Sequence, residues 1–228
     1  MRPSLEPVLP GRVVGIDEAG RGSVLGALVV GGFAVDGDRD RELRQLGVRD
    51  SKKLTPTRRE EIRSGLTDVG TCWAVPLHPL EIDRWVSGGR LNQLEARTFA
   101  EIVRASRADR AYVDACDVNA PRFGRLVSRL SASRTQVISR HRADDEFLIV
   151  GAASIVAKVA RDRSIRELEA QCGRTLGSGY PSDPTTIESV RWLLGEGAAS
   201  MPEQIRQSWA TTQRLKAERS ARTLDSFP

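Results

Sequence analysis

Four acidic residues stand where α/β folds build reactive sites. Asp17 and Glu18 end a β-branched run, Asp114 ends a later apolar run, and Asp144 opens a helical pattern. Carboxylates gathered at one point repel one another, and divalent cations relieve that repulsion. Oxygen ligands suit Mg²⁺ or Mn²⁺, and two such ions about 3.5–4 Å apart can support phosphoryl displacement. The alternative is a set of solvated surface acids, which the adjacency of Asp17 and Glu18 disfavours.

The elements that must position these acids follow from the pattern of apolar residues. Short β-branched runs indicate strands, and longer amphipathic stretches between turn residues indicate helices. The resulting α/β order predicts a mixed sheet flanked by helices. The predicted strands are 13–16, 24–35, 71–77, 111–114 and 135–139. A short predicted helix ends at residue 46. The other predicted helices are 55–68, 91–108, 121–130, 144–171, 184–194 and 202–216.

Composition excludes several classes of protein. The 228 residues are 39% hydrophobic and 29% charged, as in an ordinary soluble chain. Three cysteines without a CxxC pair argue against a disulfide framework and a zinc site. No apolar run reaches the ~18 residues that a membrane span requires, and residues 1–11 do not resemble a signal peptide. We therefore expect a cytoplasmic protein with a flexible leader at 1–11.

The net charge of +5 permits nucleic-acid binding without requiring it. Its distribution is uneven, because ten Lys and Arg residues face only four acids between Arg122 and Arg166. That local excess of +6 is either a binding surface or solvated surface charge. The residues alone leave both interpretations open.

Seven blocks of sequence carry a resemblance to a known family. In order, they are residues 15–22 (GIDEAGRG), 50–54 (DSKKL), 91–95 (LNQLE), 112–119 (YVDACDVN), 152–162 (AASIVAKVARD), 177–184 (GSGYPSDP) and 206–209 (RQSW). Together they resemble ribonuclease HII of the archaeal-type branch, from about residue 13 to about residue 215. Ser23 and Ala27 depart from this likeness, because the family usually has proline there.

The resemblance implies an RNase H-like fold, a mixed five-stranded sheet flanked by helices, with a small C-terminal helical extension. It places the catalytic domain at 12–172 and a substrate-binding extension at 173–228. It also implies an endoribonuclease acting on RNA–DNA hybrids and on duplex DNA that contains ribonucleotides. Cleavage 5′ of the ribonucleotide would leave 3′-hydroxyl and 5′-phosphate ends, as ribonucleotide and RNA primer removal require. We expect a monomer with no membrane contact.

Carried over to this chain, the resemblance makes Asp17, Glu18 and Asp114 metal-binding catalytic acids. Asp144 is the fourth, with the adjacent Asp145 as the alternative. Two ions, Mg²⁺ or Mn²⁺, would activate the attacking water and stabilise the leaving 3′ oxygen. No side-chain nucleophile is then needed.

The same resemblance implies a set of substrate contacts. Gly20, Arg21 and Gly22 would read the ribose. The two glycines leave backbone that no Cβ obstructs for the 2′-hydroxyl, and Arg21 would hold a nearby phosphate. The ring of Tyr180 would pack on the following sugar. The further candidates, all for phosphate or substrate contact, are Lys52, Lys53, Asn92, Ser154 and Lys158.

Three of these candidates have structural alternatives. Asn92 could instead cap the helix that contains Leu94, and Lys158 could form an ion pair with Asp162. Tyr180 could simply anchor a turn. The departures at Ser23 and Ala27 bear on how the substrate is read and not on metal binding.

Two other functions fit part of the pattern. An exonuclease of the related acid-dependent fold would place its first acids as Asp-x-Glu, whereas Asp17 and Glu18 are adjacent. A non-catalytic protein that binds hybrids would keep the basic surface but would not need all four acids.

Overall fold

The computed structural model describes residues 11–48, 54–195 and 201–225. It divides into two compact units, each described here by itself. The first unit takes residues up to 18, 30–75 and 95–159, and the second takes 19–29, 76–94 and the chain from 160 onward. No helix in the described ranges is long and apolar enough to cross a membrane. The predicted leader falls mostly outside the described residues, and the domain boundary at 172 stays a prediction.

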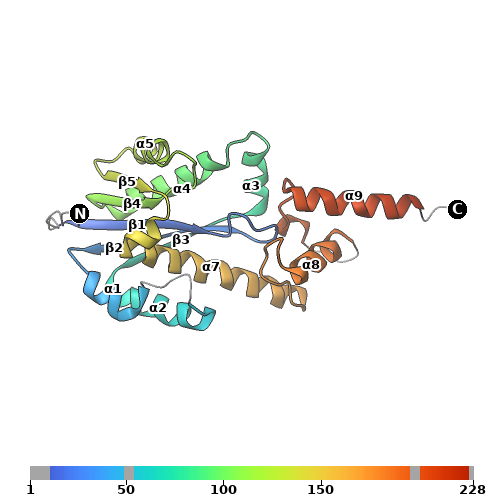
Figure 1. The fold of residues 1–228 in the computed structure, drawn as a ribbon, viewed down its shortest axis with the longest axis horizontal. Coiled ribbons are helices and arrows are strands. Elements are labelled where there is room, and N and C mark those ends of the chain that lie inside the picture. Colours follow the sequence, from blue (N-terminus) through green and yellow to red (C-terminus); the bar gives the residue numbers. More distant parts are fainter. Residues whose placement is uncertain (1–10, 49–53, 196–200, 226–228) are drawn as a thin grey trace, which may run out of the picture. The chain divides into compact units, whose positions relative to one another are not determined.

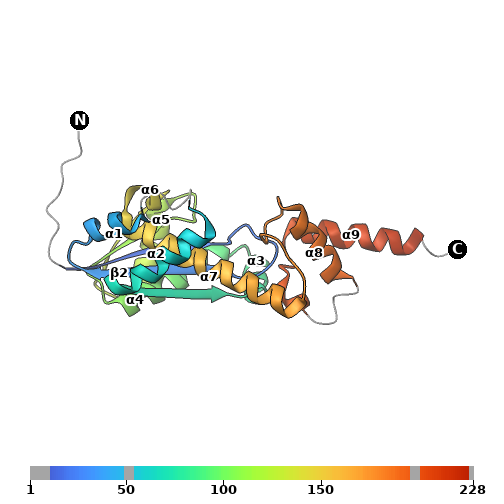
Figure 2. The same ribbon diagram turned by 90° about the horizontal axis from the view of Figure 1, so that it is seen from below.

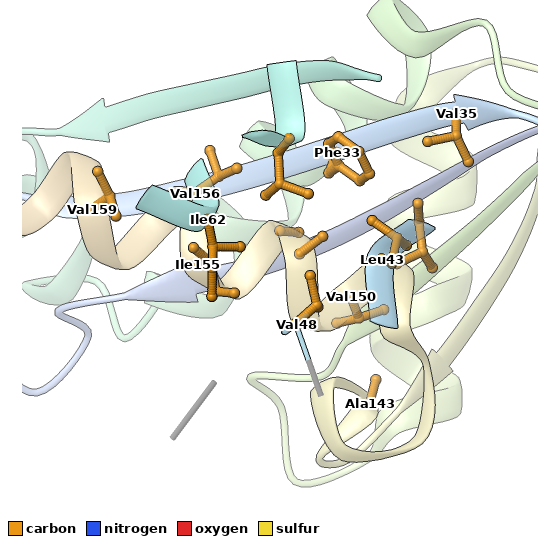
Figure 3. Close-up of a cluster of buried hydrophobic side chains, with 14 residues drawn as sticks. Phe33, Val35, Leu43, Val48, Ile62, Ala143, Val150, Ile155, Val156 and Val159 are labelled. Carbon is orange, nitrogen blue, oxygen red and sulfur yellow. The ribbon is translucent and has the colours of Figure 1, made fainter. Parts of the chain in front are cut away.

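The first unit is built on a mixed five-stranded sheet, as predicted. Its strand order is β3-β2-β1-β4-β5, and both β1–β4 and β4–β5 are parallel. Strand β2 runs opposite to β1 and β3 (Figure 3). The strands are β1 (Arg12–Ala19), β2 (Leu28–Asp36), β3 (Thr71–Leu77), β4 (Arg110–Asp114) and β5 (Gln136–Arg140).

Helices cover both faces of this sheet (Figure 1). On one face lie α1 (Asp40–Leu46), α2 (Pro56–Val69) and the first half of α7 (Leu148–Cys172), which Figure 2 shows in front of the strands. On the other face lie α4 (Leu91–Ser106) and α5 (Ala120–Ser131), joined by an edge-to-face contact between the rings of Phe99 and Phe123.

The core of the first unit fills the space between β2 and the helices α1, α2 and α7 (Figure 3). Phe33 of β2, Ile62 of α2 and Val156 of α7 are almost completely buried in it. Small residues allow α7 to approach the strands closely. A Cβ added at Gly15 would overlap the backbone of Ile149, and one at Gly31 would overlap the backbone carbonyl of Ala153.

Local sequence explains where several helices begin. The Thr55 side chain accepts a hydrogen bond from the backbone N–H of Arg58 at 3.2 Å, and Pro56 occupies the first helical position of α2. The Asn119 side chain caps α5 in the same way through the N–H of Arg122 at 2.9 Å. These helix starts agree with the sequence predictions to within one residue.

Other predicted elements were wrong. The chain has a helix that was not predicted, α3 (Pro79–Val86), and residues 24–27 form a buried loop instead of the start of a strand. The helix predicted over 144–171 is interrupted at Phe147, which has extended backbone between α6 (Ala143–Glu146) and α7. The helix predicted over 202–216 is divided into a 3-10 turn, η3 (Pro202–Gln204), and α9 (Ala210–Asp225).

The second unit has its own apolar cluster. Val24 and Leu25 pack there with residues from the end of α7, from α8 (Pro184–Leu194) and from α9. Backbone pairing reinforces this packing, because Leu25 forms an isolated bridge with Ile205 and the N–H of Arg206 donates to the Val24 carbonyl at 3.0 Å. Residues far apart in sequence therefore hold the loop at residues 19–29.

Candidate active site

Three of the four predicted acids meet at one edge of the sheet. Strands β1 and β4 are parallel and pair Ile16 with Val113, so Asp17 and Asp114 are the next residues on neighbouring strands. Asp144 lies in α6, immediately after β5, and acts electrostatically on both carboxylates. The carboxyl ends of parallel strands thus place these acids together, as the sequence predicted.

Asp17 is the most perturbed of these carboxylates. Its residue is only 6% exposed. Burial, then the charge of Asp114 and, more weakly, that of Asp144 raise the pKa of Asp17 to about 7. The Ser154 hydroxyl of α7 partly offsets this rise, although it is aimed at the carboxylate without the geometry of a full hydrogen bond. The backbone N–H of Glu18 also lowers it, donating to Asp17 Oδ1 at 2.8 Å.

Asp114 is held at the end of β4 by the segment that precedes α6. Its Oδ1 accepts a hydrogen bond from the backbone N–H of Ala143 at 3.3 Å. Burial still raises the pKa of Asp114, and the charge of Asp144 adds to the rise. The backbone of Arg142 is left-handed, with φ of 57°, and this turn directs the start of α6 toward Asp114.

The geometry separates Asp144 from its neighbour Asp145. Asp144 is half-buried and faces the acids of β1 and β4, whereas Asp145 is exposed and forms an ion pair with Arg142 at 3.1 Å. Of the two candidates for the fourth acid, Asp144 is therefore the one that shares the electrostatic environment of Asp17.

The donor set fits a hard divalent cation. Carboxylates that raise one another's pKa gain free energy when a positive ion is placed among them. Glu18, half-buried beside Asp17, adds a further carboxylate. Among the described residues, no three acidic, histidine or cysteine side chains already converge on one point as a ready metal site.

Helix α7 contributes two more predicted residues. Ser154 is completely buried close enough to Asp17 to lower the pKa of that carboxyl, so its hydroxyl is not presented to solvent. Lys158 is half-buried one turn later and forms no ion pair within the described part of the chain. Asp162, its proposed partner, instead pairs with Arg161 at 3.5 Å.

In the second unit, Gly20 begins a tightly held loop. Gly20 has a φ of +85°, and a Cβ there would come within 2.9 Å of the Ala27 carbonyl oxygen. The N–H and the hydroxyl of Ser23 both donate to the Gly20 carbonyl, at 3.2 and 2.8 Å. Ser23, which departs from the family pattern, thus fixes the turn with hydrogen bonds where a proline would restrict φ.

A buried arginine holds the same loop from the other side. The Arg206 residue is 0% exposed. Its guanidinium donates to the carbonyls of Gly20 at 2.7 Å, Arg21 at 2.8 Å and Gly26 at 3.2 Å, and the ring of Trp209 lies 4.9 Å from it. The sequence suggested no role for Arg206, and the only signal was its place at the start of the seventh block of the resemblance, residues 206–209.

Gly22 differs from Gly20. It is exposed, and a Cβ added at Gly22 would have no neighbour within 4 Å among the described residues. The structure of this unit therefore does not itself require glycine at this position.

Asn92 orients the arginine of the Gly-Arg-Gly loop. Its Oδ1 accepts a hydrogen bond from Arg21 Nη2 at 2.7 Å. Helix α4 already begins at Leu91, so the alternative that Asn92 is the N-cap is wrong.

Tyr180 is half-buried under a cation. The guanidinium of Arg161 lies 4.7 Å from its ring centroid, and Arg161 also donates to the Ser178 carbonyl. Arg161 is only 5% exposed. It fixes the position of Tyr180, and sequence analysis did not identify this role. Lys52 and Lys53 lie outside the described residues.

Most of the chain is similar to one family of known proteins. The family described as Ribonuclease HII matches residues 14–212. The chain belongs to the ribonuclease HII family. Ribonuclease HII of Methanothrix thermoacetophila is 42% identical over 90% of this chain and 97% of its own, and that of Cenarchaeum symbiosum is 47% identical over 90% and 98%.

Solved structures of ribonuclease HII relatives have the same fold. Ribonuclease H2 from Pyrococcus horikoshii has a TM-score of 0.81 and 38% identity, covering 91% of this chain and 98% of that one. The PCNA:RNase HII complex from Archaeoglobus fulgidus has a TM-score of 0.80 and 37% identity, covering 90% and 96%. The present chain is thus a metal-dependent endonuclease of ribonuclease H type HII, a class that acts on RNA–DNA hybrids.

Proposed function

We propose that this enzyme incises duplex DNA 5′ of an embedded ribonucleotide and cleaves the RNA strand of hybrids. The products carry 3′-hydroxyl and 5′-phosphate ends, which suits ribonucleotide and RNA primer removal. The observation that most directly supports the metal-dependent part of this proposal is the buried Asp17 carboxylate, because burial and the charges of Asp114 and Asp144 raise its pKa to about 7. Such a site favours cations strongly and discriminates against a neutral or anionic occupant.

Asp17, Glu18, Asp114 and Asp144 would hold two divalent ions, Mg²⁺ or Mn²⁺. When bound, the ions supply an activated water and stabilise the charge on the leaving 3′ oxygen. The protein's own part is positional. Parallel strands fix Asp17 beside Asp114, the Glu18 N–H orients Asp17, and the Ala143 N–H orients Asp114.

Gly22 is the residue of the Gly-Arg-Gly loop best placed to meet a ribose. The Gly20 carbonyl already accepts from Ser23 and Arg206, and the Arg21 carbonyl accepts from Arg206. The exposed backbone of Gly22 has no Cβ to keep a sugar away. A backbone contact to the 2′-hydroxyl distinguishes RNA from DNA without reading the base.

The remaining substrate contacts divide by chemistry. Tyr180, supported from one side by Arg161, offers a ring for the sugar that follows the ribonucleotide. Arg21, oriented by Asn92, and Lys158 suit phosphate oxygens. Lys52 and Lys53 remain proposed phosphate contacts on sequence grounds. The C-terminal extension as a substrate-binding element, the monomer and the cytoplasmic location also stay predictions.

One gel tests the proposal. The protein is incubated with a labelled DNA duplex that holds a single ribonucleotide, with Mg²⁺, Mn²⁺ or EDTA, and the cut is mapped against a ladder. We expect one cut 5′ of the ribonucleotide in the presence of either metal and none in EDTA. Asp17→Asn should abolish the cut, while Asp68→Asn, at an exposed acid of α2, should leave it unchanged. A cut elsewhere, or full activity of Asp17→Asn, would contradict the proposal.

A further inference from the structure

The local excess of basic residues has a definite location in the first unit. From residue 118 to residue 143 the chain has six arginines and no acid. Two of the six have acidic partners, because Arg122 pairs with Asp117 at 2.6 Å and Arg142 pairs with Asp145 at 3.1 Å. The others are Arg125, Arg129, Arg134 and Arg140, all exposed. None of the residues assigned to the active site accounts for them.

Three of these four arginines line one groove. It lies between α5 and β5 and has a volume of about 660 Å³. Arg125 and Arg129 are four residues apart and so project from one face of α5, while Arg140 comes from the end of β5. No acidic residue contributes to the lining. Three guanidinium groups around one open groove make it a site for anions.

The floor of this groove is built by a close contact between helix and strand. A Cβ added at Gly124 would come within 2.8 Å of Ser139 Cβ, so glycine permits α5 to pack directly on β5. Ser139 lines the groove and is only 5% exposed, and its hydroxyl has no hydrogen-bond partner among the described residues. A buried hydroxyl without a partner is costly, and an acceptor such as a phosphate oxygen would satisfy it.

The groove begins beside the acid cluster. Arg140 pairs in register with Asp114, and neighbouring strands lie about 4.8 Å apart. From there four residues of β5, at positions 137–140, line the groove over about 13 Å. A nucleic-acid strand carries one charge about every 3.4 Å along its axis, so the groove has room for several phosphates next to the site of cleavage.

We propose that the α5–β5 groove binds the phosphodiester backbone of the substrate. The bound segment is the part of the nucleic acid that extends from the acid cluster along β5. Arg125 and Arg129 contact phosphates there and contribute affinity but no base specificity. Continuity with a site that acts on phosphodiesters favours nucleic acid over an acidic protein segment. The inference rests on the proposed function for the identity of the duplex, although binding can be measured without cleavage.

The test compares two double variants of the full chain. Arg125→Gln/Arg129→Gln removes two groove charges, and Arg41→Gln/Arg104→Gln removes two exposed charges from α1 and α4 as the matched control. Binding of a long labelled duplex with one ribonucleotide is measured in EDTA at several salt concentrations. Each lost phosphate contact should lower the slope of log K against log[salt] by about 0.9, so the groove variant should lose about 1–2. The control should keep the wild-type slope.

Cleavage measurements separate this inference from the proposed function. With metal present, the groove variant should have a raised KM, an unchanged kcat at saturating duplex and an unchanged position of the cut. If the wild type does not cut 5′ of the ribonucleotide, the proposed function fails while the salt slopes still test the groove. If the groove variant keeps the wild-type slope and affinity, the inference is overturned, and an acidic protein segment becomes the better occupant.

Discussion

Replacing Asp17 by Asn should stabilise the metal-free protein at neutral pH while abolishing cleavage. Burial and the neighbouring charges raise the pKa of Asp17 to about 7 in the folded protein. In the unfolded chain an aspartate has a pKa of about 3.9. The folded state therefore holds the Asp17 proton more tightly than the unfolded state does.

The direction of the effect with pH follows from this difference. The stability that Asp17 contributes is fully present below pH of about 4, falls as the pH rises, and is lost once the pH passes the folded pKa. A difference of this size corresponds to about 4 kcal/mol at ~1.4 kcal/mol per pH unit. Asparagine keeps an oxygen that can accept from the Glu18 N–H and removes the charge. We expect the free energy of unfolding of Asp17→Asn at pH 8 to exceed that of the wild type by about 2–4 kcal/mol. The gain is smaller than the full difference to the extent that the wild-type site relaxes around its charged carboxylate.

Urea unfolding in EDTA at about pH 4.5 and pH 8 measures this gain, with Asp68→Asn as the exposed control. The gain should be large at pH 8 and small at pH 4.5, where wild-type Asp17 is already mostly protonated. Adding Mg²⁺ at pH 8 should stabilise the wild type by RT ln(1 + [Mg²⁺]/Kd) and should stabilise the Asn variant less. If Asp17→Asn is no more stable than wild type at pH 8 in EDTA, the argument that Asp17 is held under charge strain is refuted.

Three further predictions concern the packing and the substrate contacts. Arg206→Met should lower the free energy of unfolding in urea by about 2–4 kcal/mol, because the buried carbonyls of Gly20, Arg21 and Gly26 lose their donor. It should also weaken the discrimination between ribose and deoxyribose. Stability equal to that of the wild type would count against this role. Tyr180→Ala should lose about 1–3 kcal/mol of binding to a single-ribonucleotide duplex, measured by titration in EDTA, while Tyr180→Phe should bind nearly as wild type does. Gly15→Ala should lower Tm strongly because its Cβ would overlap the backbone of Ile149. Gly22→Ala, in contrast, should keep the wild-type Tm and lose cleavage at ribonucleotides. A Gly22→Ala enzyme of full activity would exclude the proposed ribose contact.

The acid cluster could be predicted from the sequence because each acid lies at or near the end of a strand or the start of a helix. Parallel pairing alone brings Asp17 and Asp114 to one edge. The sequence favours Asp144 and leaves Asp145 as the alternative, whereas the different surroundings of the two side chains follow from the turn at Arg142, whose left-handed backbone is a tertiary feature. Local patterns do not report such a turn.

The errors in predicted elements have similar causes. Phe147 interrupts the predicted helix, and its ring packs against that of Tyr112 at 4.5 Å, a partner thirty-five positions earlier in the chain. Residues 205–206 are not helical, because they pair with Val24 and Leu25. In both cases a contact from a distant part of the chain overrides local helix propensity.

The close packing of α7 explains why small residues and reactive acids occur together in this sequence. Gly15 and Gly31 have no side chains between the strands and the helix, so the backbone of α7 lies directly against β1 and β2. That approach excludes water from Asp17, two residues beyond Gly15, and brings Ser154 to its carboxylate. A larger residue at Gly15 would move α7 away, admit solvent and lower the pKa of Asp17 toward its ordinary value. The strand glycines that let α7 approach therefore serve the electrostatics of the site as well as the packing of the core.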